Sequence, residues 1–110
     1  MQLSTQAKGK GAVISVIGDI DLYTSPDLRK AIAKLAKKKA DPLVIDLKEV
    51  DYMDSSGVAT LVEGLQLTGR YKGAFRIATL NDGVREVFEL ARLDKVFDVY
   101  ENVDAALAGS

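Results

Sequence analysis

The chain lacks cysteine, histidine and tryptophan altogether, and it has only two prolines and few aromatic residues. Without cysteine there is neither a disulfide framework nor a thiolate nucleophile. Without histidine there is no imidazole to serve as a general base or a metal ligand, which removes most hydrolase and zinc-site interpretations. The phosphate-binding G-x-x-x-x-G-K-S/T loop is also missing. We therefore expect no enzyme activity and no cofactor.

Long apolar runs are missing as well. The longest uninterrupted apolar stretches span about five residues, against roughly 20 needed to cross a bilayer, and the N-terminus lacks the apolar core of a signal peptide. We therefore expect a cytoplasmic protein without direct membrane insertion. The net charge is −1, so the basic excess that nucleic-acid binding requires is absent. The run Lys37-Lys38-Lys39 is interpreted as the end of a helix whose negative pole it complements.

Hydrophobic residues make up 47% of the chain and charged residues 28%, as in an ordinary globular protein, and 110 residues predict one domain spanning 1–110. Short β-branched runs predict strands, and apolar residues three to four positions apart predict amphipathic helices. The expected strands cover 2–7, 12–17, 43–47, 74–78 and 96–100, and the expected helices follow residues 25, 56, 81 and 102. This order predicts an α/β fold with a small mixed sheet of about five strands flanked by about four helices.

Individual residues at the helix ends and on the helix faces carry further expectations. Ser25 is expected to cap the first helix, with Pro26 at its first position, where a missing N–H costs nothing. Gly73 is expected to end the second helix, near Tyr71-Lys72. The spacing of apolar residues predicts the buried faces of the second and third helices: Val58, Leu61, Val62 and Leu65 in the second, and Val84, Val87, Phe88 and Ala91 in the third.

The segment VDYMDSSGVA, residues 50–59, connects a buried strand to a helix and places two adjacent hydroxyls, Ser55 and Ser56, at the helix N-terminus. Unpaired backbone N–H groups and the positive end of the helix dipole favour an anion there. Either Asp54 or Ser55 could cap the helix. Gly57 would permit close packing, and Tyr52 is expected to pack beneath the turn. Five aspartates are expected to gather around this edge of the sheet: Asp19, Asp21, Asp46, Asp51 and Asp54.

The segment Val44-Ile45-Asp46-Leu47, followed by Val50-Asp51-Tyr52-Met53-Asp54-Ser55-Ser56-Gly57, resembles the signature of the STAS domain family. That family includes bacterial anti-sigma factor antagonists and the cytoplasmic domains of sulphate transporters. Gly18-Asp19-Ile20-Asp21 resembles the family's early motif, in which glycine, any residue, an apolar residue and aspartate follow one another. The later elements also come in family order, so the resemblance extends over nearly the whole chain and implies a single STAS domain.

In antagonists of that family, the serine after the motif aspartate is phosphorylated by the partner, an anti-sigma factor that is itself a serine kinase. The resemblance therefore implies that Ser55 is a phosphorylation site. Unphosphorylated antagonist would bind and sequester the kinase, and a serine phosphatase would restore this state. The resemblance also implies a non-catalytic protein whose partner-binding surface includes Asp21, Thr24, Asp54, Ser56 and Gly57.

Two other interpretations remain open at this point. Small STAS proteins also serve as cytoplasmic subunits of phospholipid-trafficking ABC transporters, where they bind the ATPase subunit. Leu67, which falls off the apolar stripe, would suit such a docking surface, whereas the retained Ser55 favours the antagonist. A receiver domain would need an acidic pair at its first strand end, a phospho-acceptor such as Asp46 and a lysine at a late strand end. Lys95 precedes the last strand instead, which argues against a receiver domain.

Overall fold

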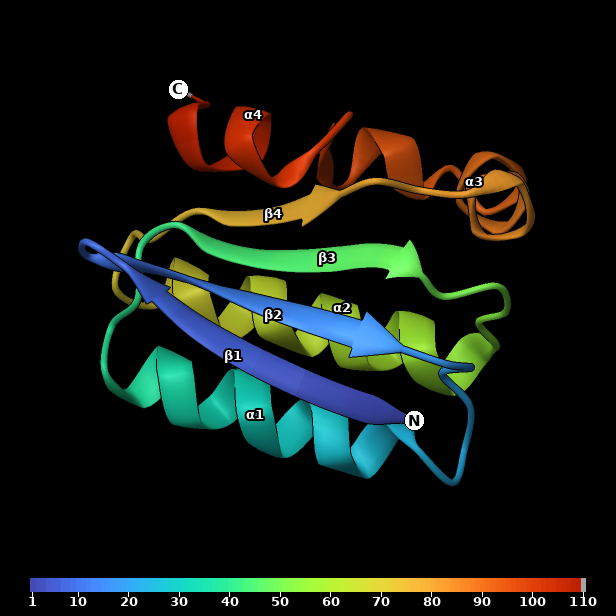
Figure 1. The fold of residues 1–110 in the computed structure, drawn as a ribbon, viewed down its shortest axis with the longest axis horizontal. Helices are drawn as coiled ribbons and strands as arrows, with labels where there is room; N and C mark the ends of the chain where they lie inside the picture. The colour runs from blue at the N-terminus through green and yellow to red at the C-terminus, as the bar shows by residue number, and fades with distance from the viewer. Residues whose placement is uncertain (110) are drawn as a thin grey trace.

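A computed structural model describes residues 1–109 of the chain. Its centre is a five-stranded sheet in which the strands lie in the order of the sequence. The strands are β1 (Gln2–Lys8), β2 (Gly11–Ile17), β3 (Leu43–Glu49), β4 (Phe75–Ala78) and β5 (Asp98–Tyr100). The β1–β2 pair is antiparallel, and all later pairs are parallel. The expected mixed sheet is therefore confirmed (Figure 1).

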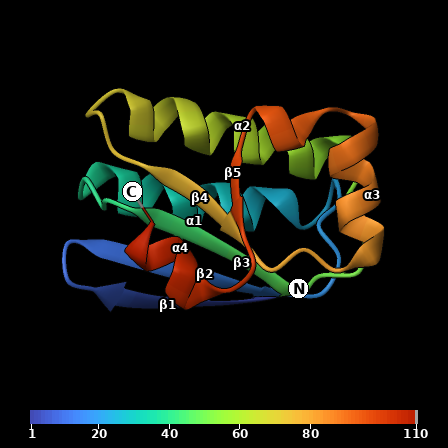
Figure 2. The ribbon, with the colours of Figure 1, turned by 90° about the horizontal axis from the view of Figure 1, so that it is seen from above.

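Helices cover both faces of the sheet. On one face, α1 (Ser25–Lys37) and α2 (Ser55–Gly69) lie side by side, and on the other lies α4 (Val103–Ala108). At the end where β2, β3 and β4 finish lies α3 (Asp82–Leu90), from which a 3-10 turn, η1 (Leu93–Lys95), leads to β5 (Figures 1 and 2). Among residues 1–109, no helix combines the length and apolar character that a membrane span requires.

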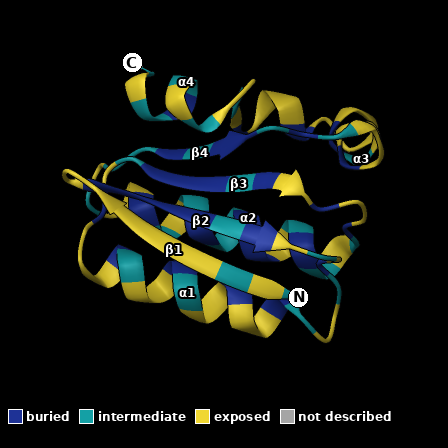
Figure 3. Ribbon diagram, in the orientation of Figure 1, coloured by how far each residue is buried: buried dark blue, intermediate teal, exposed yellow. Residues whose placement is uncertain are grey.

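The alternation of side chains along the strands builds two separate cores. Figure 3 shows that β3, in the middle of the sheet, is largely buried, whereas β1 at the edge is largely exposed. Successive residues of β3 contribute to opposite faces. The larger core, between the sheet and α1 and α2, receives Leu43, Ile45 and Leu47 from β3. The smaller core, beneath α4, consists of Val13, Val44, Ala78 and Ala106.

The start of α1 differs from the expectation. Ser25 does not cap the helix: it is the first helical residue, its side chain is buried, and its N–H donates to the Asp21 carbonyl (2.8 Å). Thr24 occupies the N-cap position but makes no side-chain capping bond, because its hydroxyl donates to the Asp19 carbonyl instead (2.9 Å). Pro26 lies in the first turn, where no N–H donor is needed.

The buried face of α2 is made largely of small side chains. Of the four residues expected there, only Leu61 is fully buried, and Val58, Val62 and Leu65 are half-buried. A Cβ added at Gly64 would lie 2.6 Å from the Phe75 ring, so α2 approaches the sheet more closely than a larger residue would allow. Leu67 is half-buried and packs against the core, so it is not the exposed docking residue considered above. The remaining buried residues of α2 are Gly57, Thr60 and Thr68.

The end of α2 also corrects the prediction. The helix finishes at Gly69, and Lys72 rather than Gly73 takes the left-handed conformation, with a φ of 61°. The N–H of Gly73 donates to the Thr68 carbonyl (2.9 Å), which satisfies one of the free carbonyls at the helix end. The chain therefore leaves the helix through a lysine in a conformation that glycine usually supplies.

The last strand begins later than predicted, at Asp98 and not at residue 96. Val96 and Phe97 precede β5, and the Phe97 ring is buried against the rings of Phe75 and Phe88, at centroid distances of 6.1 and 5.9 Å. Ala91 is exposed rather than buried, because α3 already ends at Leu90. Aromatic packing in the core therefore decides the conformation of a segment whose composition favours a strand.

Candidate functional site

Two loops that are far apart in the sequence are joined into one unit at the end of the sheet. The Ile20 N–H donates to the Tyr52 carbonyl (3.0 Å), and the Asp54 N–H donates to the Ile20 carbonyl (3.1 Å). Between these bonds, Ile20 and Met53 form a parallel bridge, and both side chains are buried. The early glycine–aspartate motif and the Asp-Ser-Ser-Gly turn therefore form a single site, and we call the two segments the joined loops.

Asp54 is the cap of α2. Its Oδ1 accepts hydrogen bonds from the N–H groups of Ser56 (2.8 Å) and Gly57 (3.3 Å), which would otherwise lack partners in the helix. Ser55 is the first residue of the helix and is exposed. Its hydroxyl makes no hydrogen bond with any residue from 1 to 109. Capping by Asp54 therefore leaves the Ser55 hydroxyl free at the positive end of a 15-residue helix.

Gly57 and Ser56 lie deeper than Ser55. A Cβ at Gly57 would lie 2.5 Å from Met53 Cγ and 2.8 Å from Ile20 Cγ2, so glycine allows α2 to pack directly on the joined loops. Ser56 is half-buried, and its carbonyl accepts a bond from the Thr60 hydroxyl (2.9 Å). Of the two adjacent serines, only Ser55 is therefore exposed.

Asp21 organises the loop before α1. Its Oδ1 accepts from the N–H groups of Tyr23 (2.9 Å) and Thr24 (3.0 Å), and the Thr24 hydroxyl accepts from the Asp21 N–H (2.9 Å). The bonds that the carboxylate accepts, first that from the Thr24 N–H, lower the pKa of Asp21 below its ordinary value of 3.8. At neutral pH the carboxylate is therefore charged and holds the loop in a fixed turn.

The five aspartates do not form one group. Asp46 lies within β3 rather than at its end, in register with Ser15 and Ala78, on the face opposite α1 and α2. Asp51 lies toward α3, and its Oδ1 accepts from the Asn81 side chain (3.3 Å). Within residues 1–109, no three acidic side chains come close enough to hold a metal ion. This places Asp46 away from the strand end where a receiver domain would need its phospho-acceptor.

Large apolar side chains are exposed on and next to the joined loops, and the sequence pattern did not predict this exposure. Leu22 and Tyr23 on one loop are 66% and 88% exposed, and Ile17 at the end of β2 is 47% exposed. Tyr52 is 53% exposed, so the expectation that it packs beneath the serine turn is wrong. We call these four residues the apolar rim. One sequence feature could have indicated it: Leu22 and Tyr23 are large apolar residues in a loop, where no helix or strand periodicity accounts for them.

Taken together, the mixed sheet, the joined loops and an exposed serine at the start of the helix after the central strand define a class of small α/β domains. The chain belongs to the STAS domain family, whose sequence model matches residues 2–106. An anti-sigma-B factor antagonist from Bacillus subtilis is 31% identical over 86 residues, which are 78% of this chain and 78% of that protein.

Solved structures agree with this assignment. An anti-sigma factor antagonist from Mycobacterium paratuberculosis has a TM-score of 0.89 and 30% identity, covering 97% of this chain and 91% of that chain. The Bacillus cell fate determinant SpoIIAA in its phosphorylated form has a TM-score of 0.76 and covers 97% of each chain. At 16% identity, the likeness to SpoIIAA shows the fold alone.

Proposed function

We propose that the chain is an anti-sigma factor antagonist, a non-catalytic cytoplasmic protein that binds an anti-sigma factor serine kinase while Ser55 is unphosphorylated. Phosphorylation of Ser55 by this kinase ends the binding, and a serine phosphatase restores it. The names of the relatives support the class of partner. The observation that carries the proposal is the exposed Ser55 hydroxyl, which is left free because Asp54 caps the helix.

The fold tolerates the modification. A phosphoserine adds roughly −1.5 to −2 charges at neutral pH. At the first position of α2 these charges meet the positive end of the helix dipole, which favours an anion. Because the Ser55 side chain is exposed, its phosphate needs no space inside the core. The domain therefore remains folded in both states.

The partner-binding surface of this domain does not tolerate a phosphate on Ser55. The new charge lies beside Asp54 and on the same joined loops as Asp21, so a partner that fits these two carboxylates meets excess negative charge and added bulk. A loss of only ~3 kcal/mol at the interface weakens binding by about a hundredfold. One modification thus changes partner affinity without changing the fold.

The residues of the proposed interface divide into two kinds. Thr24, Ser56 and Gly57 shape the loops. The Thr24 hydroxyl and the Ser56 carbonyl form hydrogen bonds within the chain, and the backbone at Gly57 packs against Met53 and Ile20. The apolar rim supplies exposed apolar surface for contact with the partner. Tyr23 and Tyr52 have the largest side chains in the rim. Buried aromatic anchors commonly carry much of the energy of an interface. We therefore place the partner over the two tyrosines and the carboxylates of Asp21 and Asp54.

Incubation with the anti-sigma factor kinase and ATP, followed by mass mapping of the modified residue, tests this function. We expect one phosphate, on Ser55. The Ser55→Ala variant should accept none, whereas the neighbouring Ser56→Ala variant should be modified as the parent is, which makes it the matched control. Modification of Ser56, or none at all, would contradict the proposal. Stable co-purification with an ABC transporter ATPase would support the transporter alternative instead.

A further inference from the structure

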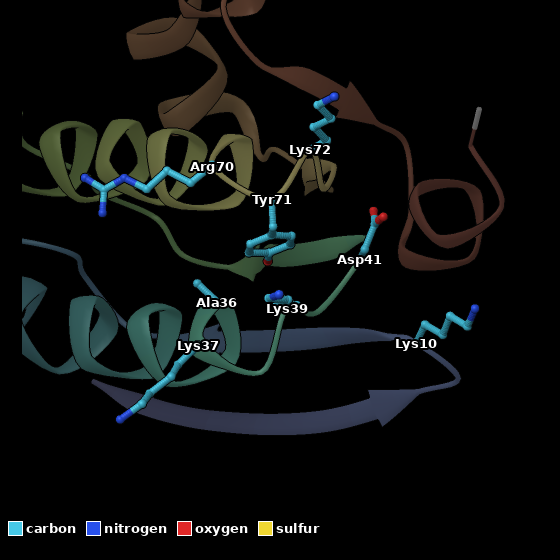
Figure 4. Close-up of a pocket in the computed structure, with 8 residues that line it drawn as sticks. All are labelled: Lys10, Ala36, Lys37, Lys39, Asp41, Arg70, Tyr71 and Lys72. Atoms are coloured by element: carbon cyan, nitrogen blue, oxygen red, sulfur yellow. The ribbon is translucent and has the colours of Figure 1, made fainter.

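A hollow of about 680 Å³ lies at the end of the molecule opposite the first turn of α2, which begins at Ser55. In Figure 1 this is the end where the β1–β2 turn and the last turns of α1 and α2 meet. Figure 4 shows Lys39 beside the Tyr71 ring at its centre, while the side chains of Lys10, Lys37, Arg70 and Lys72 extend outward from it in different directions. Five cations and one carboxylate line it: Lys10, Lys37, Lys39, Arg70 and Lys72, with Asp41. We call this set the basic hollow.

Hydrogen bonds hold together the three backbone segments that carry these cations. The Tyr71 hydroxyl donates to the Ala40 carbonyl (2.7 Å), which ties the end of α2 to the loop after α1. The Asp41 N–H donates to the Lys10 carbonyl (2.9 Å), which adds the β1–β2 turn, and Asp41 Oδ1 accepts from the Ala74 N–H (2.8 Å). Burial, together with the charge of Asp41, raises the pKa of Tyr71, so its donor proton is retained at neutral pH. The hollow is therefore formed before any ligand arrives.

The cations of the basic hollow have no anionic partner in the described part of the chain. Among residues 1–109, an ion pair joins Arg29 to Glu63 (2.8 Å), and none involves a residue of the hollow. The single carboxylate, Asp41, already accepts a backbone N–H. The negative ends of α1 and α2 offset part of the positive charge, but Lys10 belongs to neither helix. In the described part of the chain, no ion pair therefore offsets the positive charge around the hollow.

Two of these lysines occupy positions that disfavour lysine. Lys39 and Lys72 follow α1 and α2 with φ values of 59° and 61°, in the left-handed region. Glycine and asparagine adopt this conformation more readily than a long side chain does. Glycine or asparagine would suit the backbone better at both positions but would carry no charge. Lysine at these positions adds two positive charges to the hollow.

We propose that the basic hollow binds an anion that bears phosphate groups with more than one negative charge. The guanidinium of Arg70 offers paired donors that match phosphate oxygens, and the lysines add point charges on flexible stems. Such an anion could be a free polyphosphate compound or the headgroup of an anionic lipid. Since the hollow and Ser55 lie at opposite ends, binding here leaves the partner surface accessible.

Two titrations of the full chain distinguish the two sources. The first adds inorganic triphosphate and follows amide NMR signals, and the second adds vesicles of phosphatidylglycerol with phosphatidylcholine, with pure phosphatidylcholine as reference. The test variant is Lys39→Asn with Lys72→Asn, which removes two charges while asparagine suits the left-handed backbone. The matched control, Lys30→Gln with Lys95→Gln, removes two exposed lysines that do not line the hollow.

We expect shifts confined to the β1–β2 turn and the ends of α1 and α2, and affinity lowered roughly tenfold or more in the test variant alone. Binding of triphosphate without vesicles assigns a free phosphate compound, and binding of anionic vesicles without triphosphate assigns a lipid headgroup. Either result supports the proposal, as does binding of both. Binding of neither probe would overturn it, and so would an equal loss in the control variant, because bulk charge would then explain the attraction.

Discussion

Substitution of Gly57 by alanine tests whether the joined loops and α2 pack as tightly as the structure indicates. The added Cβ would lie 2.5 Å from Met53 Cγ and 2.8 Å from Ile20 Cγ2, and both of these side chains are buried. Overpacking of this kind costs about 1–3 kcal/mol, while the better helix propensity of alanine restores about 1 kcal/mol. We expect a net loss of up to about 2 kcal/mol, which corresponds to a melting temperature up to about 10 °C lower.

The same helix supplies the control for this prediction. A Cβ at Gly69 would meet no atom within 4 Å, so Gly69→Ala should stabilise the protein slightly or leave it unchanged. Urea unfolding followed by circular dichroism measures both variants. If Gly57→Ala proved as stable as Gly69→Ala, the close contact between α2 and the joined loops would be refuted, and with it the structural basis for the position of Ser55.

Three further predictions concern the same end of the molecule. Asp54→Ala should cost about 1–2 kcal/mol in urea unfolding, because it removes the α2 cap; a loss within experimental error would mean that another group caps the helix. The pKa of Asp21 is lowered, chiefly by the Thr24 N–H, so its stabilising effect is present above 3.8 and is lost as the pH falls through the lowered pKa. The stability advantage of the parent over Asp21→Asn should therefore disappear on acidification, and an advantage that persists in acid would contradict this. Tyr23→Ala should weaken kinase binding in calorimetry by about tenfold or more, whereas Leu90→Ala, also exposed but on α3, should not; equal affinities would place the partner elsewhere.

The order of elements was predictable because the strands and helices carry regular patterns. β3 reads as an apolar run and lies at the centre of the sheet, and α1 buries Leu28 and Ile32 as its periodicity indicates. The packing face of α2 was less predictable, because Gly57 and Gly64 carry almost no hydropathy signal. Their importance depends on how closely the helix approaches Phe75 and the joined loops, which is a tertiary property.

The candidate site was predictable in part. The turn at Ser55 could be located from the strand before it and the helix after it, and Asp54 was one of two expected caps. The pairing of Ile20 with Met53 could not be read from local patterns, because it joins segments more than thirty residues apart. The same limit applies to the basic hollow, whose lysines come from three separate segments, and to Tyr52, whose exposure depends on the loop conformation.

The most direct test of the switch compares the affinity of the unmodified protein and of protein phosphorylated on Ser55 for the anti-sigma factor kinase. The free energy of unfolding is measured on the same two samples. We expect binding about a hundredfold weaker after phosphorylation, with an unchanged unfolding free energy, because the phosphate lies at an exposed helix N-terminus. Equal affinities, or an affinity lost only because the phosphorylated domain unfolds, would contradict the proposed switch.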